Sequence, residues 1–168
     1  GSLACSLQSP DTIRAQTAQI RALTYPPFCL NFFAQDVPKP DPRDVERAKE
    51  WLKPIWSSLG WTELPMPAKW CEEFSVQFET PIELRPAVAS FTFGILSVQQ
   101  IKRLHDAGIL VVGTITHADE AIAWQSRGAD AVIASGTDAG GHRGTFICAQ
   151  EDAKLSTFEL LPTVVEAV

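Results

Sequence analysis

The fold is determined by residues 97–135, which have the sequence SVQQIKRLHDAGILVVGTITHADEAIAWQSRGADAVIAS. Two stretches, Ser97–Ala107 and Thr116–Arg127, have helical spacing, and each is followed by a glycine that supplies the left-handed turn at a helix end. Apolar runs follow at Ile109–Ile115 and Ala129–Ser135, as is typical of buried strands. Strands that recur roughly every 22 residues through helices predict right-handed βαβ crossovers and a parallel sheet.

The rest of the chain shows the same alternation with less regular spacing. We expect strands at Phe28–Phe33 and Ala87–Gly94, and helices at 10–23, 43–59, 68–79 and 155–168. Pro26 and Pro27 should end the first helix, because proline cannot continue one. The helix at 43–59 is predicted to be amphipathic, with Trp51 on its apolar face. The aromatic face of the helix at 68–79, which includes Trp70, is predicted to face the core.

Two architectures share this alternation, an open doubly wound sheet and a TIM (β/α)8 barrel. Four strands are clear, and a complete barrel takes about 250 residues, so a chain of 168 residues holds only about half of one. At this length a single domain is expected. The helix at 155–168 should lead into a further strand, and the sequence stops before one appears.

Composition argues against several classes of partner. The net charge is −6, with 14 Lys+Arg scattered among 20 Asp+Glu, so we expect no nucleic-acid or anionic-membrane partner. No run approaches the roughly 20 apolar residues of a membrane helix. The four cysteines form no CxxC pair and no metal-like spacing with histidine, which favours reduced thiols in a cytoplasmic protein without a metal site. With no leader and no initiating Met, we expect the chain to follow a tag or to begin within a longer protein.

The chemistry is concentrated in the segment Gly136–Gly144, which follows the last clear strand and has the sequence GTDAGGHRG. In either parallel architecture such a loop lies at the carboxyl edge of the sheet, where ligands bind. Its glycines allow the backbone to approach a flat ring or a phosphate, although a structural turn is an equal alternative. His142 has the side chain best suited to remove a proton at neutral pH, and a purely structural loop histidine is the competing interpretation. Arg143 could steer an anionic substrate or simply be solvated.

Other polar residues are weaker candidates. His105 lies in the last turn of a predicted helix, where the helix dipole favours a partly positive ring, and His117 opens the next helix. Asn31 lies at the end of an apolar strand, where it either makes a strand hydrogen bond or points its amide into the same site. Thr92 and Thr114 occupy similar places on the next two strands.

The sequence resembles the nitronate monooxygenase (2-nitropropane dioxygenase-like) family of FMN-dependent barrel enzymes. The matching segments are Pro27–Phe33, Ser90–Gly94 and Gly128–Gly144, in the family's order and on its strands. The resemblance implies that residues 1–168 are an incomplete TIM barrel. The first strand would lie before Gly1, and the strands that carry a glycine-rich FMN-phosphate site would follow Val168.

The resemblance also implies roles for individual residues. His142 matches the catalytic base, and the positions that match FMN contacts are Asn31, Ser135, Gly140 and Gly141. Two positions depart from the family pattern, since the family often has Gln at Ser135 and His at Thr92. The implied reaction oxidises a nitronate or nitroalkane with O2 to a carbonyl compound and nitrite. The alternatives are a related FMN barrel that reduces a quinone or an enoyl thioester with NAD(P)H, and an inactive fragment.

Overall fold

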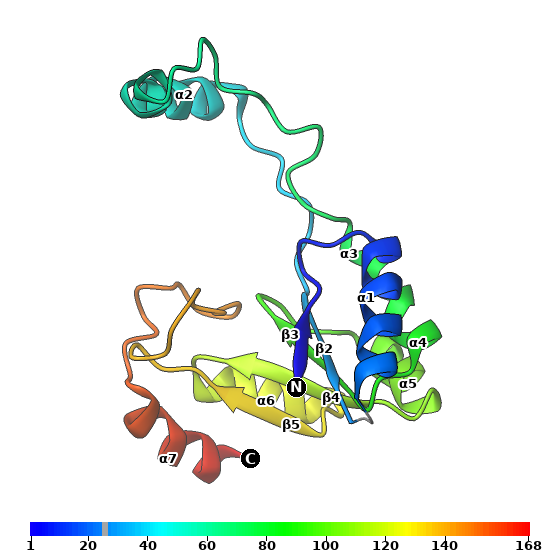
Figure 1. Cartoon of the computed structure of the whole chain (residues 1–168). Coiled ribbons are helices and arrows are strands. Elements are labelled where there is room, and N and C mark those ends of the chain that lie inside the picture. The colour runs from blue at the N-terminus through cyan, green and yellow to red at the C-terminus, as the bar shows by residue number, and fades with distance from the viewer. Residues whose placement is uncertain (25–26) are drawn as a thin grey trace.

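The computed structural model describes residues 1–24 and 27–168 and shows a five-stranded parallel sheet flanked by helices (Figure 1). The strands are β1 Ser2–Ala4, β2 Cys29–Phe33, β3 Val88–Thr92, β4 Leu110–Ile115 and β5 Ala131–Ala134. Each strand pairs in parallel with the next one along the chain. This is the strand order of an incomplete (β/α)8 barrel, so the predicted fold class is confirmed.

Seven helices are present in the described residues. They are α1 Pro10–Leu23, α2 Pro42–Ser58, α3 Phe74–Gln77, α4 Glu79–Leu84, α5 Val98–Asp106, α6 Ala118–Arg127 and α7 Thr157–Ala167. Serines cap α1, α5 and α7, and the last two have complete capping boxes that satisfy the free N–H groups of the first turn. Pro27 follows α1, whereas Pro26 lies outside the described residues.

The structure adds to or differs from the sequence-based expectations at three places. A short strand, β1, precedes the four expected ones and pairs Ser2 with Cys29; three residues with a single large apolar side chain carry no strand signal of their own. The helix expected at 68–79 is replaced by the shorter α3 and α4, and Trp70, expected in the core, precedes them and is 47% exposed, whereas Phe78 is buried. The apolar side of α2 does not face the core: α2 has no buried residue and stands apart from the sheet (Figure 1), with Trp51 75% exposed.

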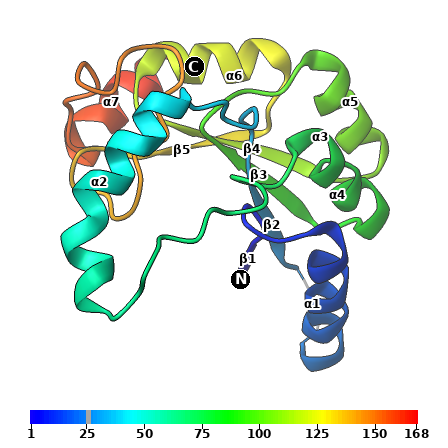
Figure 2. The same cartoon turned by 90° about the horizontal axis from the view of Figure 1, so that it is seen from above.

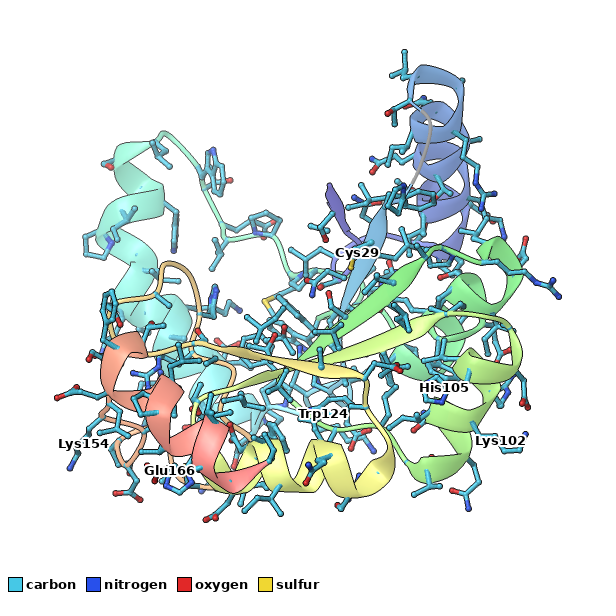
Figure 3. All side chains as sticks on the ribbon, turned by 90° about the horizontal axis from the view of Figure 1, so that it is seen from below. Cys29, Lys102, His105, Trp124, Lys154 and Glu166 are labelled. Atoms are coloured by element: carbon cyan, nitrogen blue, oxygen red, sulfur yellow. The ribbon has the colours of Figure 1, made fainter. Side chains whose placement is uncertain are left out.

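The outer face of the sheet packs against the helices and forms the core. Leu30, Phe32, Ala89, Phe91 and Val111 alternate along β2, β3 and β4 and are completely buried. Trp124 of α6 lies between this helix and the sheet (Figure 3), and its indole occupies the space that a Cβ at Gly113 would need. Figure 2 shows α1, α5 and α6 arranged around the outside of the curved sheet.

The opposite side of the sheet, here called the inner face, is open. It carries the alternate residues of each strand, and the registers align Asn31 with Ser90 on β2 and β3. Two apolar side chains of this face are half exposed, Leu110 at 53% and Ile133 at 49%. In the described part of the chain the inner face therefore lacks the layer that covers the outer one.

Candidate active site

The segment Gly136–Gly144, here called the glycine loop, leaves the carboxyl end of β5 and is fixed at its start against α7. A Cβ at Gly136 would lie 2.0 Å from the backbone nitrogen of Thr157, so packing requires this glycine. Asp138 Oδ1 accepts the N–H of Thr157 at 2.6 Å and its hydroxyl at 2.9 Å. These two bonds lower the pKa of Asp138, which keeps a charged carboxylate at the amino end of α7, where the helix dipole favours it.

The far end of the glycine loop is fixed over the carboxyl ends of β3 and β4. Gly144 is buried, and a Cβ there would lie 2.8 Å from the Cγ2 methyl of Thr92 and 3.5 Å from that of Thr114. The hydroxyls of these two threonines lie 3.1 Å apart, within hydrogen-bonding distance. The loop therefore crosses the carboxyl edge of the sheet in close contact with Thr92 and Thr114, which confirms their predicted location at this edge.

A buried carboxylate, Glu120 of α6, holds the chain that follows the glycine loop. Its side chain is completely buried, and Oε1 accepts the backbone N–H groups of Phe146 at 2.7 Å and Ile147 at 3.1 Å. Oε2 accepts the N–H of Thr116 at 2.7 Å and its hydroxyl at 3.1 Å. Sequence reasoning missed Glu120, because an acidic residue in the first turn of a helix is expected simply to favour the helix dipole.

Between these two anchors lies His142, which is exposed. Its ring approaches the ring of Phe93 edge to face, with centroids 6.1 Å apart and planes at 80°. Phe93 in turn contacts Phe33 edge to face at 4.7 Å. The predicted base therefore lies at the carboxyl edge, beside two aromatic rings that the sequence did not single out.

The predicted flavin-contacting residues lie on or above the inner face. Asn31 is the middle residue of β2, so the prediction that it ends its strand was wrong, and its Nδ2 donates to Ser90 Oγ at 2.9 Å. Ser135 directly follows β5, and its N–H donates to the carbonyl of Ile115 at 2.8 Å. Strand alternation places Ser135 on the same face as Ile133.

The glycines of the loop differ in what requires them. Gly141 has φ +83°, a conformation that residues with a Cβ rarely adopt. Gly140 has an ordinary φ, and a Cβ there would meet nothing within 4 Å. Contacts within the described chain explain Gly136 and Gly144, and backbone conformation explains Gly141. Neither explains Gly140, beside which the space is open.

The remaining charged candidates have structural partners. The guanidinium of Arg143 donates to the backbone carbonyl of Ala153, so this arginine braces the segment after the loop and is not a freely solvated side chain. His105 Nε2 lies 2.9 Å from Asp130 Oδ2. His117 is the N-cap of α6, and its Nδ1 accepts the N–H of Asp119 at 3.2 Å.

The surface around the predicted site is open. A hollow of about 430 Å³ lies between α2 and the segment Leu64–Trp70, away from the glycine loop.

Within residues 1–24 and 27–168, no cluster of three or more His, Cys, Asp or Glu side chains has the arrangement of a metal site. Nor does any helix of these ranges have the length and apolarity needed to cross a membrane.

Comparison with known sequences identifies relatives across the whole chain. A sequence model of a family described as "NMO: Nitronate monooxygenase" matches residues 1–168. A "Probable nitronate monooxygenase" of Staphylococcus haemolyticus is 35% identical over 158 residues, 93% of this chain and 44% of the relative. One of Staphylococcus aureus (strain MSSA476) is 36% identical over 150 residues, 89% of this chain and 42% of the relative. The chain thus spans less than half the length of the curated relatives it matches.

Two solved structures also superpose on the whole of this chain. The nitroalkane oxidase of Streptomyces ansochromogenes superposes with a TM-score of 0.88 at 34% sequence identity, over all of this chain and 48% of its own. FabK of Thermotoga maritima superposes with a TM-score of 0.67 at 23% identity, over all of this chain and 40% of its own, and this likeness concerns the fold alone.

Proposed function

Since the chain belongs to the nitronate monooxygenase family, we propose that it binds FMN at the carboxyl edge of its sheet and takes part in the oxidation of nitronates or nitroalkanes by O2. The observation that carries this proposal is the position of His142, at the carboxyl edge between two anchored ends of the glycine loop. A base held in this way is positioned without being enclosed, so a substrate can reach it.

The residues at this edge fit a flavin. A flavin is a flat aromatic ring system with a polar edge, and it requires an apolar surface with a few hydrogen-bonding groups beside it. Ile133 offers apolar surface on the inner face, Asn31 and Ser135 offer polar groups, and Gly140 leaves space for a close backbone approach. When bound, FMN supplies the redox chemistry, carrying electrons from the nitronate to O2.

The chain's own residues bind the substrate and move a proton. The α-carbon proton of a nitroalkane is acidic because the resulting charge spreads onto the nitro oxygens. An imidazole nitrogen of His142 takes this proton and leaves the nitronate; a nitronate that arrives already ionised does not need this step. Cleavage of the carbon–nitrogen bond then gives a carbonyl compound and nitrite.

The experiment is a His142→Asn substitution in the FMN-loaded protein. Asparagine keeps a polar group of similar size but removes the base, so turnover of neutral nitroethane should fall by about 10²–10⁴-fold. Oxidation of preformed ethyl nitronate should fall much less, and flavin content should stay unchanged. Oxygen uptake and nitrite release measure the two activities.

The matched control is His117→Asn. Asparagine is a good N-cap, so this variant should keep the start of α6 and both activities. Equal losses with the two substrates at constant flavin content would exclude a base role for His142. NAD(P)H consumption without a nitro compound would instead favour a quinone or enoyl-thioester reductase, and a protein that binds no FMN would favour an inactive fragment.

A further inference from the structure

Phe93 has a backbone conformation that needs an explanation. Among the described residues other than glycine, only Arg85, at φ +47°, and Phe93, at φ +66°, have a positive φ. Arg85 is the C-cap of α4, where a left-handed residue is ordinary. Phe93 follows a β-strand and caps no helix, and its Cβ makes this conformation costly. Such strain persists where the surrounding structure enforces it, and it is often found at functional sites.

The strained backbone changes the face on which the Phe93 ring lies. Along β3, Ala89 and Phe91 point to the buried outer face, and regular alternation would send residue 93 the same way. Its ring instead contacts the ring of Phe33. Phe33 lies two residues after Asn31 on β2 and pairs with Thr92, so it is on the inner face. The left-handed turn thus moves a large apolar ring from the core side to the open side of the carboxyl edge.

The residue that follows β2, Ala34, holds this turn in place. The N–H of Ala34 donates to the carbonyl of Thr92 at 2.8 Å, which continues the β2–β3 ladder to the turn. A Cβ at Gly94 would lie 2.0 Å from the carbonyl oxygen of Ala34, so the residue after Phe93 must be a glycine. The Phe93 ring is therefore fixed by the ends of two strands.

The surface beside His142 is consequently apolar. The rings of Phe33 and Phe93 are half-buried, so part of each remains open to a ligand. The Thr92 and Thr114 hydroxyls are turned to one another, and their methyls approach Gly144. The two charged groups of the loop are bound elsewhere: the Arg143 guanidinium by the carbonyl of Ala153, and the Asp138 carboxylate by Thr157.

We propose that Phe93 and Phe33 form an apolar subsite that receives the alkyl chain of the substrate next to His142. This inference rests on the proposed function and adds to it the two residues that determine specificity for the length of the alkyl chain, which lies on their rings. The edge-to-face contact with Phe93 also favours one orientation of the His142 imidazole beside this subsite.

The first test is a chain-length series of alkyl nitronates, from ethyl to hexyl, with the FMN-loaded protein. If each added methylene is buried on the rings, kcat/KM should rise about fourfold per methylene, the equivalent of about 0.8 kcal/mol for a buried CH₂. Phe93→Ala and Phe33→Ala should each flatten this dependence, whereas Phe93→Leu, which keeps the apolar volume, should retain most of it. Phe158→Ala is the matched control, because Phe158 is an 88% exposed aromatic residue on α7.

A second measurement does not depend on turnover. Linear carboxylates from propanoate to heptanoate are planar anions like nitronates, and their dissociation constants can be measured by calorimetric titration. Affinity should rise with length in the unmodified protein and lose this dependence in Phe93→Ala. If nitronates are oxidised but neither series depends on Phe93 or Phe33, the subsite is wrong and the proposed function stands. If no nitronate is oxidised while the carboxylate series behaves as expected, the subsite stands and the proposed function is wrong.

Discussion

Replacing Glu120 by Gln or Ala tests whether a buried carboxylate holds Thr116 and the chain that follows the glycine loop. The carboxylate accepts four hydrogen bonds, two on each oxygen, and three of the donors are backbone N–H groups. A glutamine has the same shape but replaces one acceptor oxygen with an NH₂ donor. The amide can keep its oxygen toward Phe146 and Ile147, and its NH₂ can donate to the Thr116 hydroxyl. The N–H of Thr116 then loses its acceptor.

The magnitude follows from this single lost partner. Leaving a buried N–H unpaired costs about 1–3 kcal/mol, and replacing charge-assisted bonds with neutral ones adds to this, so we expect Glu120→Gln to lower the free energy of unfolding by about 2–3 kcal/mol. Glu120→Ala removes the acceptor of all three N–H groups. We expect it to lower the free energy of unfolding by about 3–5 kcal/mol; the loss is limited because the N–H of the exposed Ile147 can bond to water instead. Total stability of a domain is about 5–15 kcal/mol, so either loss is measurable.

Urea unfolding followed by tryptophan fluorescence measures these differences. Glu79→Gln is the matched control, because Glu79 forms an exposed ion pair with Arg103 and should contribute less than about 1 kcal/mol. If Glu120→Ala changes stability no more than Glu79→Gln does, the hydrogen bonds to Thr116, Phe146 and Ile147 contribute nothing, and Glu120 does not hold the chain after the glycine loop.

Two further predictions concern the glycines and acid stability. Gly136→Ala should destabilise the protein by several kcal/mol, because its Cβ would meet the backbone of Ser156 and Thr157, whereas Gly140→Ala should leave unfolding by urea unchanged and weaken FMN binding in a fluorescence titration. Equal effects on stability would contradict the assignment of open space at Gly140. Burial of Asp130 opposes a lowered pKa, but the Val111 N–H and His105 together hold it below its ordinary value. Its stabilising contribution should therefore be present above about pH 4 and be lost as pH falls through the lowered pKa, and Asp130→Asn should remove this dependence from urea midpoints measured between pH 3 and pH 6.

Much of the fold could be predicted because local signals agree with it. The glycines after α5 and α6, the capping serines and the apolar runs of β2 to β5 act within a few residues, and the strand spacing then leaves few topologies. β1 could not be predicted, since its three residues become a strand only by pairing with β2. The position of α2 could not be predicted either, because an amphipathic pattern indicates a helix with an apolar side but not what covers that side.

The candidate site divides in the same way. Topology alone places the glycine loop and His142 at the carboxyl edge, because all parallel strands end there. The surroundings of His142 depend on two long-range features, the positive φ of Phe93 and the buried hydrogen bonds of Glu120. Neither has a local signal: phenylalanine ordinarily continues a strand, and glutamate ordinarily points to water.

The position of His142 therefore depends on three separate parts of the fold. Asp138 fixes one end of the glycine loop to α7, Glu120 fixes the chain after it to α6, and Gly144 packs against Thr92 and Thr114 on β3 and β4. A substitution at any of these anchors should reduce activity without removing the base. Because preformed nitronates do not need the base, displacement of His142 alone should lower the turnover of neutral nitroalkanes much more than that of preformed nitronates, as loss of His142 does. Equal losses with the two substrates would show instead that the anchor also shapes the part of the site that binds the nitronate or FMN.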